Sequence, residues 1–363
     1  MADTAPSQSI TGNTSYPQRL FMTLVVVVLA LLIWHTLHII LLMFAGIIFA
    51  VFLRNNGKFL AEKTGMKEGW GITIVILVLL ILLTVALFFM VPQVADQADE
   101  LSTKLPETWD SLKENVSDTA VGGWLLRRMP SADQLASSVG GLMKKATSWL
   151  YSAVGAISGI LIILALGIYG SYDADMYING TKKLVPKRKR DRARRTLHGV
   201  GTTLYWWLIG RLVSMLIIGI FTFIGLWFMG MPLALTLAVF AAVMTFIPNI
   251  GPVISVIPAV ILALGSQDGV HAGYVVALYA GIQMVESYLI TPLVQRQIIS
   301  MPPALILSAQ IIMGVIQGVI GILLAVPLVA VIIVLVKLLY IEDVLEDHDI
   351  HIQAEDREKK ARN

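Results

Sequence analysis

Long apolar stretches separated by short polar segments dominate this chain. Several of them reach the roughly 18 residues that a helix needs to cross a bilayer. The first, Leu20–Leu53, is too long for one span, and we divide it at the polar pair His35 and His38 into spans at about 20–34 and 38–53. The other stretches predict spans at about 71–91, 149–172, 204–229, 233–264, 270–290 and 304–340. This pattern predicts an all-α polytopic membrane protein with about eight transmembrane segments.

The amino-acid composition agrees with a membrane protein. Of the 363 residues, 56% are hydrophobic and 14% are charged, whereas about 25% of the residues of a soluble domain are charged. The mean hydropathy is +0.77. The chain has no cysteine, which excludes disulfides, thiolate metal sites and cysteine nucleophiles.

The charges of the polar segments predict an orientation. Basic residues concentrate in the segments 54–69 and 173–203, so the positive-inside rule places both in the cytosol. The acidic segment 93–148 has apolar residues at helical spacing, and we expect a helical extracytoplasmic insert there. The basic run Lys187–Arg190 is explained by the same orientation rule; the alternatives are binding of anionic lipid and, less plausibly, of nucleic acid.

These segments predict the organisation of the whole chain. In order, we expect a disordered cytosolic tail at 1–18, three N-terminal spans at 19–92, the helical insert at 93–148, a span at 149–172, a basic cytosolic loop at 173–203, a transport core at 204–340 and a charged cytosolic tail at 341–363.

Two apolar stretches of the core resemble each other at an offset of 70 residues. Residues 231–235 (MPLAL) align with 301–305 (MPPAL), and Gly251 aligns with Gly321. Gly, Pro and amide residues interrupt both stretches, and counting the spans makes one hairpin open outward and the other inward. Such inverted repeats with discontinuous helices point to a transporter's binding site. The alternatives are chance similarity and two complete spans per stretch.

The interruptions supply the candidate residues of the hairpin tips. They are Pro248, Asn249, Gly251, Pro252, Gln310, Gly314, Gln317, Gly318 and Gly321. Irregular backbone survives at membrane depth only where it is buried in protein or lines a watery cavity. The tips are therefore expected to form a gate or a site, and the alternative role of their amides is to hydrogen-bond the interrupted backbone.

Charged residues within the spans are the other candidates. A charge near the bilayer centre costs roughly 2.5–3.5 kcal/mol or more, so each one requires an explanation. Glu286 shares a helix face with Gln283, and Arg211 is expected at a similar depth on another span. These residues form either a static Arg211–Glu286 link or a site that couples transport to a proton or ion.

The sequence gives little support for metal binding or catalysis. His35 and His38 have no accompanying ligand cluster, so an interfacial role is favoured over metal binding. The chain contains no Walker A loop, no His-Glu-x-x-His helix and no nucleophile elbow at a strand–helix turn. We therefore expect neither an enzyme nor a bound cofactor.

Three strings in the core resemble the autoinducer-2 exporter (AI-2E) family of bacterial membrane proteins. They are 246–252 (FIPNIGP) followed by 257–259 (IPA), 286–294 (ESYLITPLV), and 314–321 followed by 324–328 (LAVPL). The resemblance covers most of 20–340 and is most specific at 245–330. One departure is the sequence Ser300-Met301-Pro302-Pro303, which stands where many members have a His-Pro step. A protonatable histidine is therefore absent there.

The resemblance implies a homo-oligomeric permease, a pentamer in this family, in the bacterial inner membrane; the span count and tail composition place both termini in the cytosol. It implies export of a small polar molecule such as autoinducer-2. If export is coupled to a proton, Glu286 is our candidate for the titrating group, with Arg211 or Gln283 tuning it. A sodium(lithium)/proton antiporter and a passive channel-like oligomer are the alternatives. The expected partners are the transported molecule or cation, membrane lipid and further copies of the chain, but no nucleic acid.

Overall fold

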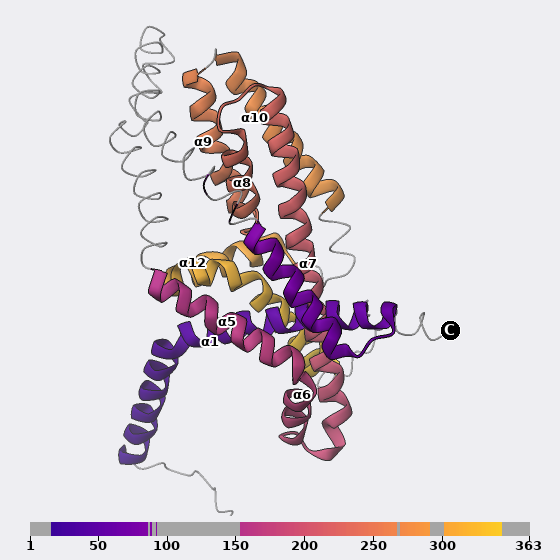
Figure 1. The fold of residues 1–363 in the computed structure, drawn as a ribbon. Helices are drawn as coiled ribbons and strands as arrows, with labels where there is room; N and C mark the ends of the chain where they lie inside the picture. The colour runs from indigo at the N-terminus through magenta and orange to yellow at the C-terminus, as the bar shows by residue number, and fades with distance from the viewer. Residues whose placement is uncertain are drawn as a thin grey trace, which may run out of the picture.

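The computed structural model describes residues 16–85, 88, 92, 153–266, 269–290 and 301–342, and these residues form helices without any strand (Figure 1). The expected insert at 93–148 and nearly all of the two expected tails lie outside the described residues. The elements are α1 (Tyr16–Thr64), a helix over Glu68–Val85, α5 (Ala153–Tyr172), α6 (Ala174–Lys183), η1 (Lys187–Lys189), α7 (Arg190–Phe228), α8 (Ala234–Met244), α9 (Ile250–Ser266), α10 (Gly269–Val285), η2 (Glu286–Ile290), α12 (Pro303–Leu335) and η3 (Val336–Ile341).

The described helices include four that are long and apolar enough to cross a membrane. They are Thr36–Thr64, Glu68–Val85, Lys187–Phe228 and Pro303–Ile341. Ser158–Tyr172 and Ala174–Lys183 add a fifth if they are taken as one span, although the chain bends by 80° between them. The all-helical membrane fold is thus confirmed, while the count of eight segments stays a prediction.

The N-terminal apolar stretch differs from the expectation. We expected a turn at His35 and His38, but residues 34–38 are helical and belong to α1. A histidine pair has no helix-breaking effect comparable to that of Pro or Gly, so these polar residues alone do not interrupt the helix. Figure 1 shows that α1 instead changes direction, with its first part running away from the part that packs on α5.

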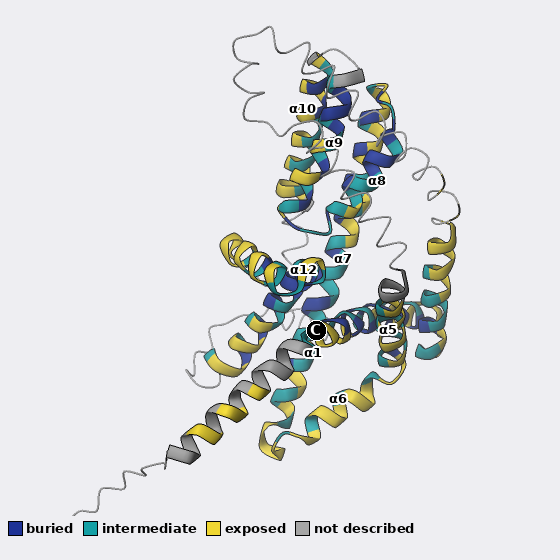
Figure 2. Cartoon of the chain, turned by 90° about the vertical axis from the view of Figure 1, so that its left-hand side faces the viewer, coloured by how far each residue is buried: buried dark blue, intermediate teal, exposed yellow. Residues whose placement is uncertain are grey.

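The helix α7 runs through the centre of the described fold. Its buried residues recur every three or four positions and most of them are small or carry a hydroxyl group: Thr196, Gly199, Thr203, Leu204, Trp207, Gly210, Ser214, Ile218, Thr222 and Leu226. Small residues let membrane helices approach one another closely. Through this face α7 contacts α1, α8, α10 and α12, and Figure 2 shows buried residues where these helices meet.

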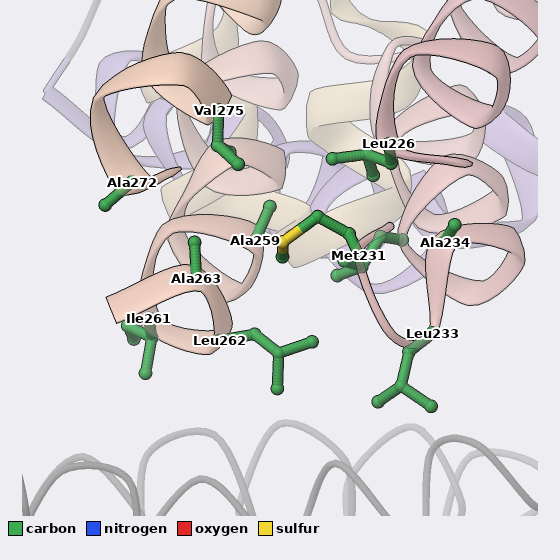
Figure 3. Close-up of a cluster of buried hydrophobic side chains, with 11 residues drawn as sticks. Leu226, Met231, Leu233, Ala234, Ala259, Ile261, Leu262, Ala263, Ala272 and Val275 are labelled. Carbon is green, nitrogen blue, oxygen red and sulfur yellow. The ribbon is translucent and has the colours of Figure 1, made fainter. Parts of the chain in front are cut away.

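Two apolar clusters hold the described helices together. One joins the end of α7 to α8, α9 and α10 through Leu226, Met231, Leu237, Leu262 and Val275 (Figure 3). The second joins α1, α7 and α12, and we call it the junction. The junction contains Leu41, Ile48, Leu204, Trp207, Leu324 and Val326, with Phe246, Met313 and Ile320 packed against them.

Both breaks predicted in the core are present. In the first stretch, α8 ends at Met244 and α9 begins at Ile250, and Asn249 between them has the left-handed φ of 65°. In the second stretch, Gly318 interrupts α12 with φ 61° and ψ −140°. Asparagine and glycine are the residues that adopt positive φ most readily. Figure 2 shows the two arms of α12 running in different directions.

Candidate functional site

The two broken stretches meet inside the protein. The side-chain amide Nε2 of Gln310, on the first arm of α12, donates a hydrogen bond of 3.3 Å to the carbonyl oxygen of Pro248 at the tip between α8 and α9. Both residues are buried, and they lie 62 positions apart in the sequence. Two residues expected only at separate hairpin tips are thus in direct contact.

Trp207 of α7 packs against the same hairpin tip from another side. Its indole ring packs edge to face on Phe246, with 5.7 Å between the ring centroids. Phe246 is two residues before Pro248 in the tip. The tip of the first hairpin is therefore held between α7 and the first arm of α12, within the apolar junction.

Two polar atoms in this region lack hydrogen bonds. Trp207 and Gln310 are 4% and 0% exposed, and neither the indole Nε1 nor the amide Oε1 has a partner within the described residues. An unsatisfied buried polar group costs about 1–3 kcal/mol. The indole can only donate and the amide oxygen can only accept, so each of these atoms needs a partner of the opposite kind.

Two glycines at equivalent repeat positions let the arms of both hairpins fold back. A methyl group at Gly251 would overlap the carbonyl oxygen of Met244, and one at Gly321 would overlap that of Met313. In a straight helix, residues seven or eight apart are separated by more than 10 Å along the axis, so both chains reverse direction at these points. Their equal role in the two tips supports the internal repeat.

Glu286 lies in a second polar group. It begins η2, a π-helical segment, and π-helical turns are frequent at functional sites. The Gln283 Nε2 atom donates hydrogen bonds of 2.9 Å to Glu286 Oε2 and 3.4 Å to Ser287 Oγ. Arg211 of α7 lies close enough to Glu286 to interact with its charge, and η2 contacts α7.

The structure thus brings together the three residues expected to act in coupling. Arg211 and Trp207 are four positions apart on α7, which places them on the same side of the helix one turn apart. The charged group around Glu286 and the uncharged junction therefore adjoin successive turns of α7 on one side of the helix.

The remaining expected tip residues lie around the two breaks. Asn249 and Gly318 are exposed, while Pro252, Gly314 and Gln317 are half-buried. His38 is exposed and the side chain of His35 lies outside the described residues. In the part of the chain that is described, no three His, Asp or Glu side chains lie together as metal ligands would.

Sequence reasoning missed Trp207. A tryptophan in an apolar span has the same signature whether it faces lipid or the protein interior. The signal that would have identified it is the row of small and hydroxyl residues at Thr203, Gly210 and Ser214, which marks the packed face of α7.

Comparison with known proteins identifies a family of transporters. A sequence model described as AI-2E family transporter matches residues 21–341. Candidate transport proteins of bacteria are similar over most of their length. YrrI of Bacillus subtilis is 28% identical, with 68% of this chain and 71% of that protein aligned. YueF of the same organism is 24% identical over 80% and 81%, and YhhT of Escherichia coli is 26% identical over 74% and 76%.

Proposed function

Because the chain belongs to the AI-2E family of transporters, we propose that it is a secondary transporter that exports a small polar molecule. A role in membrane transport follows from the family and from the membrane-spanning helices. The polarity of the cargo, the direction of transport and the coupling to an ion are our proposals. We propose transport, rather than catalysis, as the activity of the chain.

One observation carries this proposal, the contact of Gln310 with Pro248 between the two broken stretches. Transporters with inverted repeats bind their cargo where discontinuous helices meet. In this protein the meeting place adjoins the junction, which is apolar apart from the indole Nε1 of Trp207, and the amide oxygen of Gln310 at the tip likewise has no partner within the described residues. Since none of the residues that form the junction is charged, an uncharged polar cargo suits it best.

We place ion coupling at Glu286. Its carboxylate accepts a hydrogen bond from Gln283 and lies near Arg211. Arg211 lies one helical turn from Trp207 on α7. Protonation of Glu286 would weaken its attraction to Arg211 and so change the forces on the turn of α7 that contacts the junction. This arrangement links the charge of Glu286 to the gate without requiring an ion inside the junction.

The same group of residues favours a second candidate function, sodium(lithium)/proton antiport. In this function Glu286, beside Arg211 and Gln283, would bind a proton and a cation in alternation, and no organic cargo is required. We further propose a homo-oligomer in the bacterial inner membrane with both termini in the cytosol. A passive channel-like oligomer would need no titration of Glu286.

Everted membrane vesicles distinguish these functions. An interior-acid gradient is formed and reported by a pH-sensitive dye, and sodium, lithium and potassium are added in turn. Uptake of labelled autoinducer-2 into the same vesicles tests export of an uncharged polar cargo. Each assay is repeated with Glu286→Gln.

The three candidate functions predict different results. Gradient-dependent uptake of autoinducer-2 that is lost in Glu286→Gln supports the exporter. Collapse of the gradient by a cation, lost in the same variant, supports the antiporter instead. Uptake that persists without a gradient and in Glu286→Gln would refute both and leave a passive pathway.

A further inference from the structure

The short helix α6 points in a different direction from α5, the helix before it. α5 has 20 residues and is about 30 Å long, which matches the hydrocarbon thickness of a bilayer. The chain then bends by 80° into α6. We take α5 alone as the span here, and a helix that leaves a spanning helix at such an angle lies close to the membrane plane, at the membrane surface.

The chain from α6 to Val185 has two different faces. Ala174, Ile178 and Val185 recur at helical spacing on one side and are half-buried, and α6 contacts α7. On the other side, Met176, Tyr177 and Leu184 are 62%, 54% and 86% exposed. Apolar side chains that include a tyrosine are typical of the surface by which a helix enters the membrane interface.

Cations without counter-charges adjoin this apolar face. Nine basic and three acidic residues lie between Asp173 and Arg195. Asp175 is already paired, because its Oδ2 lies 2.8 Å from Arg54 Nη2. Of the nine basic side chains, seven form no ion pair within the described residues: Lys182, Lys183, Lys187, Arg188, Lys189, Arg190 and Arg194.

We propose that this surface, from Met176 to Lys189, is a binding site for anionic phospholipid. The apolar side chains enter the interface while the lysines and Arg188 contact the phosphates of the headgroups. A basic side chain near an anionic membrane surface strengthens binding by about fivefold, so removing three cations should weaken the preference for anionic lipid by tenfold or more. The site binds lipid whether or not the transported molecule is present.

The absence of cysteine allows a direct test with the full chain. Thr181→Cys, on an exposed position of α6, is labelled with an environment-sensitive fluorophore in the detergent-purified protein. Short-chain phosphatidylglycerol or phosphatidylcholine is then titrated into the micelles. The test variant adds Lys187→Gln, Arg188→Gln and Lys189→Gln, and the matched control adds Lys58→Gln, Lys63→Gln and Lys67→Gln.

We expect half-saturation at a phosphatidylglycerol fraction at least tenfold below that of phosphatidylcholine, with the difference lost in the test variant and kept in the control. Equal responses to the two lipids would overturn the proposal. So would an equal loss in both triple variants, because it would reflect net charge alone. If the test variant does not fold, the labelled protein carrying only Thr181→Cys is titrated in high salt instead. Salt screens the charges, so the preference for phosphatidylglycerol over phosphatidylcholine should then disappear.

Discussion

Gly251, at the tip of the first hairpin, should tolerate no side chain, and the structure indicates how much an alanine there would destabilise the protein. Alanine at this position gains at most about 1 kcal/mol of helix propensity. Its methyl group would overlap the carbonyl oxygen of Met244. Overpacking typically costs about 1–3 kcal/mol, and the upper end applies here because the obstacle is backbone that cannot rotate away. The net loss is about 2 kcal/mol.

Gly273 on α10 is the matched control. A methyl group there has no neighbour within 4 Å, so Gly273→Ala should stabilise the protein by about 1 kcal/mol. At roughly 2 °C per kcal/mol, Gly251→Ala should lower the apparent Tm by about 4 °C, whereas Gly273→Ala should raise it by about 2 °C. The measurement is thermal unfolding by intrinsic fluorescence at one fixed scan rate, because membrane proteins often unfold irreversibly. A rise in Tm for Gly251→Ala would refute the close approach of α8 and α9.

Three further predictions concern the polar contacts. Gln310→Leu removes the donor to the buried carbonyl of Pro248 and should lower stability by about 1–3 kcal/mol, measured in the same melting assay. Trp207→Phe keeps an aromatic ring but removes the Nε1 donor; transport kinetics should show a higher KM with little change in Tm, and an unchanged KM would remove the indole from the cargo site. Arg192→Gln should destabilise the protein by about 1 kcal/mol more than Glu342→Gln, because Arg192 bonds the carbonyl oxygen of Leu338 at 2.6 Å as well as Glu342 at 3.4 Å, whereas Glu342→Gln removes the pair with Arg192 and a weak 3.9 Å pair with Arg195. Equal melting temperatures for these two variants would show that the bond to the carbonyl contributes no more than the Arg195–Glu342 pair.

The sequence predicted the breaks in the core because local chemistry determines them. Proline lacks the backbone N–H that continues a helix, and glycine and asparagine tolerate the positive φ values seen at Gly318 and Asn249. The same reasoning failed at His35 and His38, because polarity by itself does not interrupt a helix. It also gave no sign of the 80° bend between α5 and α6.

The contacts between distant segments could not be predicted in the same way. A lone glutamine such as Gln310 shows no pattern that names Pro248 as its partner, because their pairing depends on how two hairpins pack. By contrast, Gln283 and Glu286 are three residues apart on one helix, so their contact follows from helical geometry alone. Local spacing thus predicted half of the candidate site, and tertiary packing determined the other half.

The uninterrupted length of α7 has a mechanical consequence. Its 39 residues make a rod of about 58 Å, nearly twice the thickness of the hydrocarbon core. Arg192 near its start pairs with Glu342 directly after η3, Trp207 contacts the tip at Phe246, and Gly225 near its end lies against Leu278 of α10. A tilt of such a rod by about 10° displaces one end by about 10 Å relative to the other. A small tilt of α7 on one side of the bilayer would therefore appear on the opposite side as a displacement the size of a small solute.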